Sequence, residues 1–136
     1  MKTVVVAAGV LVENGKVLLT QRKAGAHLEG LWEFPGGKVE AGEDPRAALA
    51  RELKEEVDLD VSVGDAVDVT FHRYEEVEKA VLLLFFEVTR KPGSGDPKAV
   101  DVAALRWTAH GELDALTFPA ADVAIVRRVK TLLRDA

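Results

Sequence analysis

The chain has 136 residues, of which 48% are hydrophobic and 30% charged, so it can bury one core and is expected to form one domain over residues 1–136. Its formal net charge of -5 argues against nucleic acid as a partner, because a nucleic-acid backbone favours a basic face. The absence of cysteine excludes disulfides and thiolate chemistry and is compatible with a reducing cytoplasm, which is the expected location.

The first predicted elements form a hairpin. Apolar runs at 4–12 and 16–22 flank Asn14-Gly15, a pair that tolerates positive φ and favours a tight turn. The lysine and apolar run at the start also resemble a signal peptide, but polar residues at 13–15 interrupt the run and favour strand, turn, strand. No run approaches the roughly 20 apolar residues of a membrane span, so no membrane partner is expected.

A short strand and then a helix are predicted next. The strand covers 31–34 and ends at Pro35, and a glycine loop follows it. Asp44 is a good N-cap and Pro45 a good first helical residue, so a helix is predicted from there to Val57. One face of this helix is expected to pack on the core, because it carries an apolar stripe. The stripe consists of Ala48, Leu49, Leu53 and Val57.

Further strands and a second helix complete the predicted architecture. Strands are expected at about 61–73 and 77–89, and the second is almost wholly apolar, which favours a buried central position. The composition predicts a loop at 90–99, a strand at 105–107 and a helix at 120–135. Because strands precede and separate the two helices, the predicted fold is α/β, with a mixed β-sheet sandwiched between α-helices.

The first predicted helix crowds acidic side chains onto one face. Glu52, Glu55 and Glu56 have the i, i+3, i+4 spacing that brings side chains together on a helix. Like charges at this spacing cost roughly 0.2–0.5 kcal/mol per pair, and nothing in the sequence offsets all three. Such a cluster is usually a solvated acidic face, but a hard divalent cation such as Mg²⁺ also takes carboxylate oxygens as ligands.

The surrounding residues favour the metal interpretation. Gly36 and Gly37 let the backbone turn closely, so the Gly36 carbonyl can also reach a cation. Glu43 lies just before the helix, and Arg51 can orient carboxylates with its rigid fork. The order is Gly37, five residues, Glu43, seven residues and then Arg51-Glu52-Leu53-Lys54-Glu55-Glu56-Val57-Asp58-Leu59.

This order resembles the Nudix box, glycine-x5-glutamate-x7-Arg-Glu-apolar-x-Glu-Glu-x-glycine-apolar, at every specified position except one. The exception is Asp58, where the family has a glycine that ends the helix, often in a left-handed conformation. Aspartate can adopt that conformation at a cost of about 1 kcal/mol. We therefore expect a small loss of stability from Asp58, and no loss of activity.

The Nudix resemblance implies a hydrolase that cleaves a nucleoside diphosphate linked to another group, with Mg²⁺ or Mn²⁺ as its cofactor. In such chemistry the metal ions bridge phosphate oxygens and orient or deprotonate the attacking water. The resemblance implies that Glu43 and Arg51 hold the box glutamates in place, and that Lys38 is either a phosphate contact or an ordinary surface lysine. The metal ligands that it implies are Gly36, Glu52, Glu55 and Glu56.

Similarity to the MutT-like branch, which acts on nucleoside triphosphates, extends over nearly the whole chain. It is carried by the segments 4–22, 32–43 and 118–122. In that branch an acidic residue stands six positions before a late tryptophan, and here Asp101 precedes Trp107 by six. Asp101 is therefore a candidate for an additional metal ligand or for the base, and an ordinary loop aspartate is the alternative.

The resemblance also implies where the nucleobase is read. Asp122 occupies the position from which MutT-like enzymes read the base, and Arg22, His27 and Glu33 are expected to lie around it. A lone loop histidine is, however, more often simply solvated. An ionised aspartate only accepts hydrogen bonds, which suits the amine of cytosine or the N1–H and N2–H₂ edge of guanine. A buried aspartate that is protonated also donates, so 8-oxo-dGTP stays a candidate.

The leading interpretation is a pyrophosphohydrolase that releases a nucleoside monophosphate and pyrophosphate from a triphosphate such as 8-oxo-dGTP. CTP or 5-methyl-dCTP is an alternative substrate, and a dinucleoside polyphosphate is another, since that branch has a tyrosine near Tyr74. An ADP-ribose enzyme is disfavoured, because no proline lies between Pro45 and Pro92. A non-catalytic Nudix-fold binding module is the alternative from another class, but such modules usually lose box glutamates. The sequence does not fix the oligomeric state.

Overall fold

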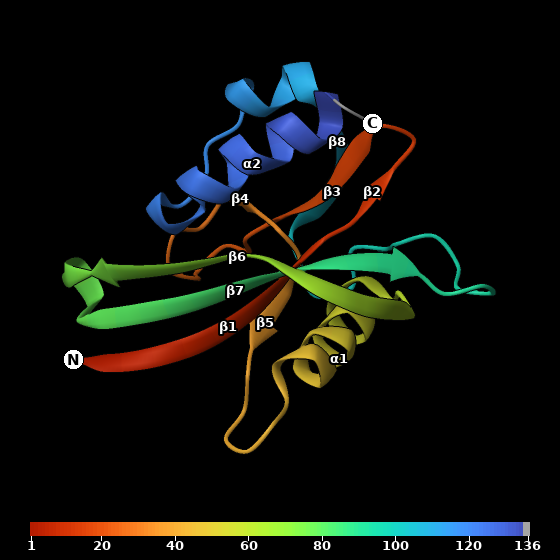
Figure 1. Cartoon of the computed structure of the whole chain (residues 1–136). Coiled ribbons are helices and arrows are strands. Elements are labelled where there is room, and N and C mark those ends of the chain that lie inside the picture. Colours follow the sequence, from red (N-terminus) through yellow and green to blue (C-terminus); the bar gives the residue numbers. More distant parts are fainter. Residues whose placement is uncertain (135–136) are drawn as a thin grey trace.

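The computed structural model describes residues 1–134 and arranges the strands in two sheets (Figure 1). The first sheet is mixed, with the order β5-β1-β7-β6, and only the β1–β7 pair in it is parallel. Its strands are β1 (Lys2–Val10), β5 (Gly36–Lys38), β6 (Val61–Tyr74) and β7 (Lys79–Arg90). The second sheet is antiparallel, and in it β3 (Lys16–Gln21) pairs with β2 (Val12–Glu13), β4 (Trp32–Glu33) and β8 (Ala104–Ala109).

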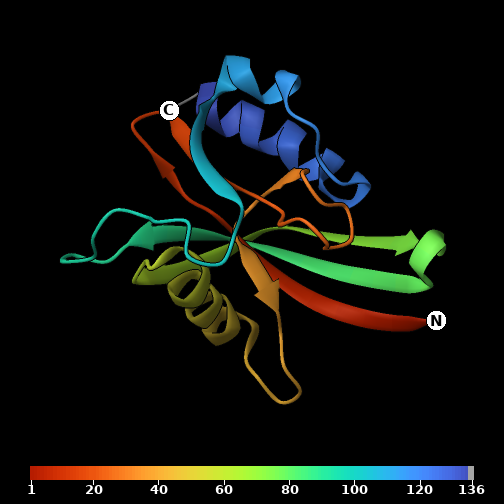
Figure 2. The same ribbon diagram turned by 180° about the vertical axis from the view of Figure 1, so that it is seen from behind.

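The helices lie on opposite sides of the first sheet (Figures 1 and 2). Helix α1 (Pro45–Val57) covers one face, while α2 (Val123–Arg134) and the second sheet lie on the other. Short 3₁₀ helices add η1 (Glu75–Val77), η2 (His110–Ala115) and η3 (Ala120–Asp122). The predicted α/β fold with a mixed sheet between helices is confirmed, and the second sheet is an addition to it. Within residues 1–134, every helix falls short of the length and apolar character needed to cross a bilayer.

The central strands are apolar on both faces because both faces are covered. Successive side chains of a strand point to opposite sides, so Ala7 and Phe86 pack in the core on the α1 side. Ala8 and Phe85 pack in the core on the α2 side. This explains why β1 and β7 are continuous apolar runs instead of alternating ones.

The predicted strand over 4–12 is wrong, because the run is divided between the two sheets. β1 ends at Val10 and β2 begins at Val12, with Leu11 buried between them. The turn at Asn14-Gly15 is confirmed, and both residues have positive φ, 52° and 75°. Hydrophobicity alone predicts that the run is extended and buried, but not that its two halves pair with different partners.

Other predicted boundaries shift by a few residues. Only two residues of 31–34 pair as a strand, and β5 was missed because two adjacent glycines are typical of a loop. The strand predicted at 105–107 is longer, and the helix predicted at 120–135 begins as the 3₁₀ helix η3. Residue 135 lies outside the described residues. The strands β6 and β7 and the loop after Arg90 agree closely with the prediction.

Both ends of α1 are capped as the sequence predicts. The Asp44 side chain accepts a hydrogen bond from the Arg46 amide at 3.1 Å, which satisfies one of the free donors of the first turn. At the other end Asp58 is left-handed, with φ 56° and ψ 39°, and its amide donates to the carbonyls of Leu53 and Lys54. The caps fix where the helix begins and ends, and therefore where its acidic face lies.

The loop between β7 and β8 completes the C-terminal end of α1. The amides of Val100 and Asp101 both donate to the Glu56 carbonyl at 3.0 Å, and the Lys98 amide donates to the Val57 carbonyl at 2.9 Å. These bonds satisfy carbonyls that a helix end otherwise leaves free. The loop is thereby held against the turn of α1 that carries Glu56.

Candidate active site

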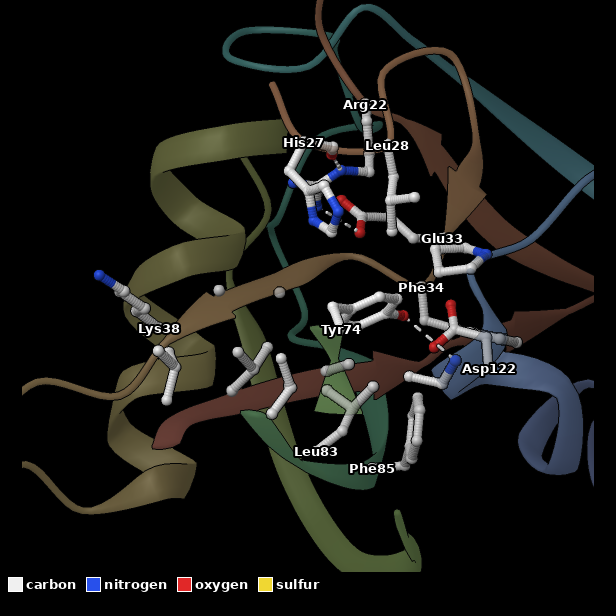
Figure 3. A pocket seen from close by; sticks show the side chains of 18 of the residues that line it. Arg22, His27, Leu28, Glu33, Phe34, Lys38, Tyr74, Leu83, Phe85 and Asp122 are labelled. Carbon is white, nitrogen blue, oxygen red and sulfur yellow. Dashed lines mark hydrogen bonds and ion pairs between the residues drawn. The ribbon is translucent and has the colours of Figure 1, made fainter. Parts of the chain in front are cut away.

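A cavity of about 250 Å³ lies between the first sheet and the segments that lead into β4 and α2 (Figure 3). Its walls come from parts of the chain that are distant in sequence, so only the folded protein assembles it. In Figure 3, Lys38 lies far from Asp122, with Tyr74 and Leu83 between them. The predicted site residues that line the cavity are Arg22, His27, Glu33, Gly36, Lys38, Glu56 and Asp122.

The two glycines of β5 allow three elements to meet beside the cavity. A β-carbon on Gly36 would lie 2.0 Å from the Ala7 carbonyl oxygen of β1. A β-carbon on Gly37 would lie 2.3 Å from the carboxyl carbon of Glu52 on α1. Only glycine permits these approaches, because side chains do not pack at such distances. The Glu52 carboxylate therefore lies directly against the main chain of β5.

Arg51 connects the acidic side chains of α1. Its Nε and Nη2 donate to the two carboxylate oxygens of Glu43 at 2.8 and 3.0 Å, a bidentate pair. Its Nη1 donates to Glu52 at 3.0 Å and to Glu55 at 3.3 Å. Its Nη2 also donates to the Lys38 carbonyl at 3.2 Å. These hydrogen bonds lower the pKa of Glu43 to about 2, so Glu43 stays ionised as the partner of Arg51.

Glu56 stands outside this hydrogen-bonded set and lines the cavity. Burial raises its pKa to about 8, and the negative charges of Glu52, Glu33, Asp101 and Glu55 add to the shift in that order. Burial also raises the pKa of Glu52, which Arg51 opposes. The turn of α1 around Glu56 therefore holds more carboxylates than nearby cations can neutralise.

The chemistry of these donors fits a hard divalent cation. Carboxylate and carbonyl oxygens are the ligands that Mg²⁺ and Mn²⁺ prefer, and the surplus negative charge attracts a cation. In residues 1–134 no group of three or more His, Cys, Asp or Glu side chains already surrounds a single point. The reason is visible in the contacts, since Glu52 and Glu55 turn toward Arg51.

Asp101 is brought near α1 but not into the cavity. Its side chain is 61% exposed and forms an ion pair with Lys23 at 2.5 Å. Its amide binds the Glu56 carbonyl, and its charge contributes to the raised pKa of Glu56. The structure thus places Asp101 beside the acidic cluster, paired with Lys23, a residue that no sequence motif singled out.

Arg22, Glu33 and His27 meet on another side of the cavity (Figure 3). The Arg22 Nη1 pairs with Glu33 at 3.0 Å, and its Nε donates to the His27 carbonyl at 2.6 Å. Burial raises the pKa of Glu33, which Arg22 opposes. The His27 ring is not free in solvent, since its Nε2 lies 3.0 Å from a carboxylate oxygen of Glu76. The fold therefore brings these three residues together on one wall of the cavity, and their role at the base stays a prediction.

Asp122 is the most deeply buried acid of the cavity. Its exposure is 4%, and burial raises its pKa to about 8, with the charge of Glu33 adding to the shift and Arg22 opposing it. At pH 7 the neutral carboxyl therefore predominates, and it offers one hydrogen-bond donor and one acceptor. Of the two protonation states considered from the sequence, this environment favours the protonated one, which also donates a hydrogen bond.

Sequence reasoning missed the apolar and aromatic walls. On β7, every second side chain from Lys79 lines the cavity, while Phe34, Tyr74 and Pro119 contribute from elsewhere. The signal on β7 was present in the sequence, because residues of one strand at a spacing of two share a face. The lining residues of β7 are Lys79, Val81, Leu83 and Phe85.

Comparisons with known proteins agree with this geometry. The model of the NUDIX domain family matches residues 2–129. The CTP pyrophosphohydrolase of Escherichia coli K12 is 38% identical over 125 residues, which cover 92% of this chain and 88% of that protein. The 8-oxo-dGTP diphosphatase of the same organism is 33% identical, covering 97% and 100% of the two chains. The solution structure of the E. coli ORF135 protein superposes with a TM-score of 0.80 and 34% identity, covering 97% and 91%.

Proposed function

The chain belongs to the Nudix hydrolase family, and from this premise we propose that it is a single-domain enzyme that hydrolyses nucleoside triphosphates to a nucleoside monophosphate and pyrophosphate. One observation carries the proposal. The same cavity is lined by Glu56, beside the acidic cluster of α1, and by the buried carboxyl of Asp122. A nucleotide needs both kinds of group, one set for a metal-bound phosphate chain and the other for a base edge. Location in the cytoplasm and the lack of a nucleic-acid partner remain expectations from composition.

At the phosphate end, Glu52, Glu56 and the Gly36 carbonyl would hold Mg²⁺ or Mn²⁺, with Glu55 as a further ligand after it leaves Arg51. When bound, the metal supplies neutralisation of phosphate charge and activation of water. Arg51, held by Glu43, orients Glu52 and Glu55 and keeps the acidic face of α1 in place. Arg51 and Glu43 therefore act through the ligands, and not on the substrate.

Lys38 and Asp101 have subordinate parts in this proposal. Lys38 lies at the end of the cavity away from Asp122, where an ammonium group can meet a phosphate oxygen (Figure 3). Asp101 lies outside the cavity and is paired with Lys23, so it serves as a ligand or base only after that pair opens. Its fixed contribution is the negative charge that it adds near Glu56.

At the base end, the neutral carboxyl of Asp122 can donate one hydrogen bond and accept another. That pattern complements the O6 and N1–H of guanine or 8-oxoguanine. It equally complements the N3 and N4–H₂ edge of cytosine, and this is why CTP or 5-methyl-dCTP stays as the second candidate. The rest of the wall that would face the edge of the base is formed by Arg22, His27 and Glu33. The names of the two relatives above include one substrate with a cytosine base and one with an oxidised guanine base.

The experiment is a panel of triphosphates assayed for kcat/KM, with pyrophosphate and monophosphate measured as separate products. The panel contains 8-oxo-dGTP, dGTP, CTP and 5-methyl-dCTP, with a dinucleoside polyphosphate and ADP-ribose for comparison. We expect pyrophosphate release that depends on Mg²⁺ or Mn²⁺ and stops with a chelator. Release of orthophosphate, a preference for the last two compounds, or nucleotide binding without turnover would each overturn the proposal.

A further inference from the structure

The segment that carries Asp122 is hydrogen-bonded to the first sheet through the side chain of Tyr74. The hydroxyl oxygen of Tyr74, the last residue of β6, accepts a hydrogen bond from the Ala121 amide at 3.2 Å in a buried environment. Asp122 is the next residue, and its own amide donates a hydrogen bond to the nearby Pro119 carbonyl at 2.9 Å. The tyrosine therefore supplies the link between η3 and a strand on the opposite wall of the cavity.

The Tyr74 ring is buried and packed against two other rings, which restricts the position of its hydroxyl. The residue is 8% exposed, and the rings of His27 and His72 contact it edge-on, with centroids 5.1 and 4.5 Å away. His27 is in turn bonded to Glu76 in the turn that directly follows Tyr74. A polar group fixed by packing on several sides can fix its partner in turn.

The hydroxyl also has a proton left to offer. It accepts from Ala121 through a lone pair, so its O–H points elsewhere, and in Figure 3 the Asp122 carboxyl lies beside it. Burial raises the pKa of the Tyr74 phenol, which the hydrogen bond from Ala121 opposes, so the proton is retained at neutral pH. Tyr74 thus faces both the main chain and the side chain of the segment that reads the base.

We propose that Tyr74 is the positioning residue for Asp122, and that discrimination between bases depends on the hydrogen bond between its hydroxyl and the Ala121 amide. The proposal rests on the base-reading role of Asp122 given above. It assigns no contact between Tyr74 and the reacting phosphate. Loss of the hydroxyl should therefore act on base selection and on KM, and leave the chemical step at α1 unchanged.

The test is Tyr74→Phe alone and combined with Asp122→Ala, each assayed with the 8-oxoguanine and cytosine triphosphates. The substitution keeps the ring but leaves the Ala121 amide without an acceptor. We expect the kcat/KM ratio of the two substrates to change by about three- to tenfold, as KM rises and kcat stays within twofold. In the Asp122→Ala background the same substitution should leave the ratio unchanged. Glu13→Gln, which breaks the ion pair between Glu13 of β2 and Arg90 of β7, is the control for a general loss of stability.

Each outcome separates the role of Tyr74 from the base-reading role of Asp122, and Mg²⁺-dependent release of pyrophosphate tests the hydrolysis itself. If Asp122→Ala leaves the ratio unchanged, Asp122 does not read the base, and both roles are overturned while the proposed hydrolysis stands. If Asp122→Ala changes the ratio and Tyr74→Phe does not, only the role of Tyr74 is overturned. If Tyr74→Phe changes the ratio equally in both backgrounds, Tyr74 contacts the base itself and does not act through Asp122.

A measurement on the unaltered protein covers the case in which Tyr74→Phe does not fold. Hydrogen exchange of the Ala121 amide should be slower than that of the neighbouring Ala120 amide by about tenfold or more, because a buried hydrogen bond must open first. Equal exchange of the two amides overturns the proposal, since the hydrogen bond would then not hold η3 to β6.

Discussion

At the α1 end of the cavity Arg51 is shared among Glu43, Glu52 and Glu55, whereas at the α2 end Arg22 binds Glu33 and leaves Asp122 without an ion pair among residues 1–134. Both ends therefore hold more carboxyl groups than cations. They differ in solvent access, since the side chain of Glu55 is 57% exposed and Asp122 is 4% exposed.

This difference decides how each surplus of negative charge is balanced. At the α1 end Glu56 also has a pKa of about 8, but a divalent ion held by the neighbouring carboxylates of Glu52 and Glu55 would favour its ionised form. In an apolar pocket an unpaired charge is costly, and the carboxyl keeps its proton instead. We infer that the α1 end is built to receive a metal ion and that the α2 end is built to hold a proton, and the predictions below test that contrast.

The largest effect is expected from Glu56→Gln at the α1 end. We expect kcat to fall by about 100-fold or more, the scale for loss of a well-placed catalytic group. At pH 9, above the pKa of about 8 of Glu56, the substitution removes one of several repelling charges, so it should leave the fold intact and raise the Tm measured without metal. Mg²⁺ should then raise the Tm of the unaltered protein more than that of the variant. The exposed carboxylate of Glu87 on β7 provides the control, Glu87→Gln.

Activity of Glu56→Gln within threefold of the unaltered protein would remove Glu56 from the set of metal ligands. An equal Mg²⁺-dependent rise in Tm for both proteins would lead to the same conclusion. In either case the two ends of the cavity would no longer differ in the way proposed.

The two ends also differ in how much of them the sequence could predict. The α1 end was predictable because its residues lie within one helix and the loop before it, where spacing determines which side chains meet. The caps at Asp44 and Asp58 and the stripe on α1 follow from the same local rules. The ion pairs of Arg51 with nearby glutamates could be anticipated, but the ion pair between Lys23 and Asp101 could not, because it joins two separate loops.

The α2 end needed tertiary structure. Its walls come from β1, β4, β6, β7, η3 and the loop after β3, and no local pattern states that these segments face one cavity. Asp122 was identified through resemblance alone, and its protonation depends on burial that only the fold shows. The contact between Tyr74 and Ala121 was missed for the same reason, since the two residues are distant in sequence. The sequence also did not predict that the chain passes from one sheet to the other at Leu11, because an apolar run does not determine which strands it pairs with.

The second prediction concerns Asp122→Asn at the α2 end. At pH 9, above the pKa of about 8 of Asp122, the carboxylate only accepts hydrogen bonds, whereas an amide in its place keeps both a donor and an acceptor. We expect the kcat/KM ratio of the 8-oxoguanine and cytosine triphosphates at this pH to change by about tenfold, which corresponds to about 1.4 kcal/mol or one good hydrogen bond. Asp114→Asn on η2, where the side chain is exposed, is the matched control. An unchanged ratio would mean that Asp122 does not read the base.

The third prediction uses pH to separate the two ends. The pKa of Asp122 is about 8, so raising the pH from 7 to 9 ionises the carboxyl and removes its donor. Without metal, we expect the Kd of 8-oxo-dGMP to rise by about three- to tenfold over this range for the unaltered protein. The Kd for Asp122→Asn should rise less. Because Glu56 titrates in the same range in both proteins, the difference between their two curves isolates Asp122.

The pH dependence of the Tm tests the protonation of Asp122 independently of ligand binding. The folded pKa of Asp122 lies above its ordinary value of 3.8, so its contribution to stability is fully present below about pH 4 and is lost as the pH rises toward 8. Asp122→Asn removes this dependence. The Tm of the variant relative to the unaltered protein should therefore increase between pH 5 and pH 8. Parallel Tm curves would show that Asp122 is ionised throughout.

The smallest effect is expected from Asp58→Gly, which changes the C-terminal cap of α1 and no charged residue that lines the cavity. Glycine adopts the left-handed conformation found at residue 58 without the cost of about 1 kcal/mol that a side chain incurs. The substitution also removes ion pairs with Lys54 at 3.1 Å and Lys98 at 4.0 Å, and such exposed pairs contribute about 0–1 kcal/mol. We expect a net rise in Tm of about 1–4 °C with kcat/KM within twofold.

Asp58→Asn separates the two contributions, because asparagine also tolerates the left-handed conformation but carries no charge. If it lowers the Tm while Asp58→Gly raises it, the ion pairs and the backbone conformation act in opposite directions, as argued. If Asp58→Gly lowers the Tm by several degrees, the pairs with Lys54 and Lys98 contribute more than the glycine gains. The C-terminal end of α1 would then be held by charge as well as by its cap, and an aspartate in place of the box glycine would stabilise the helix that carries Glu56.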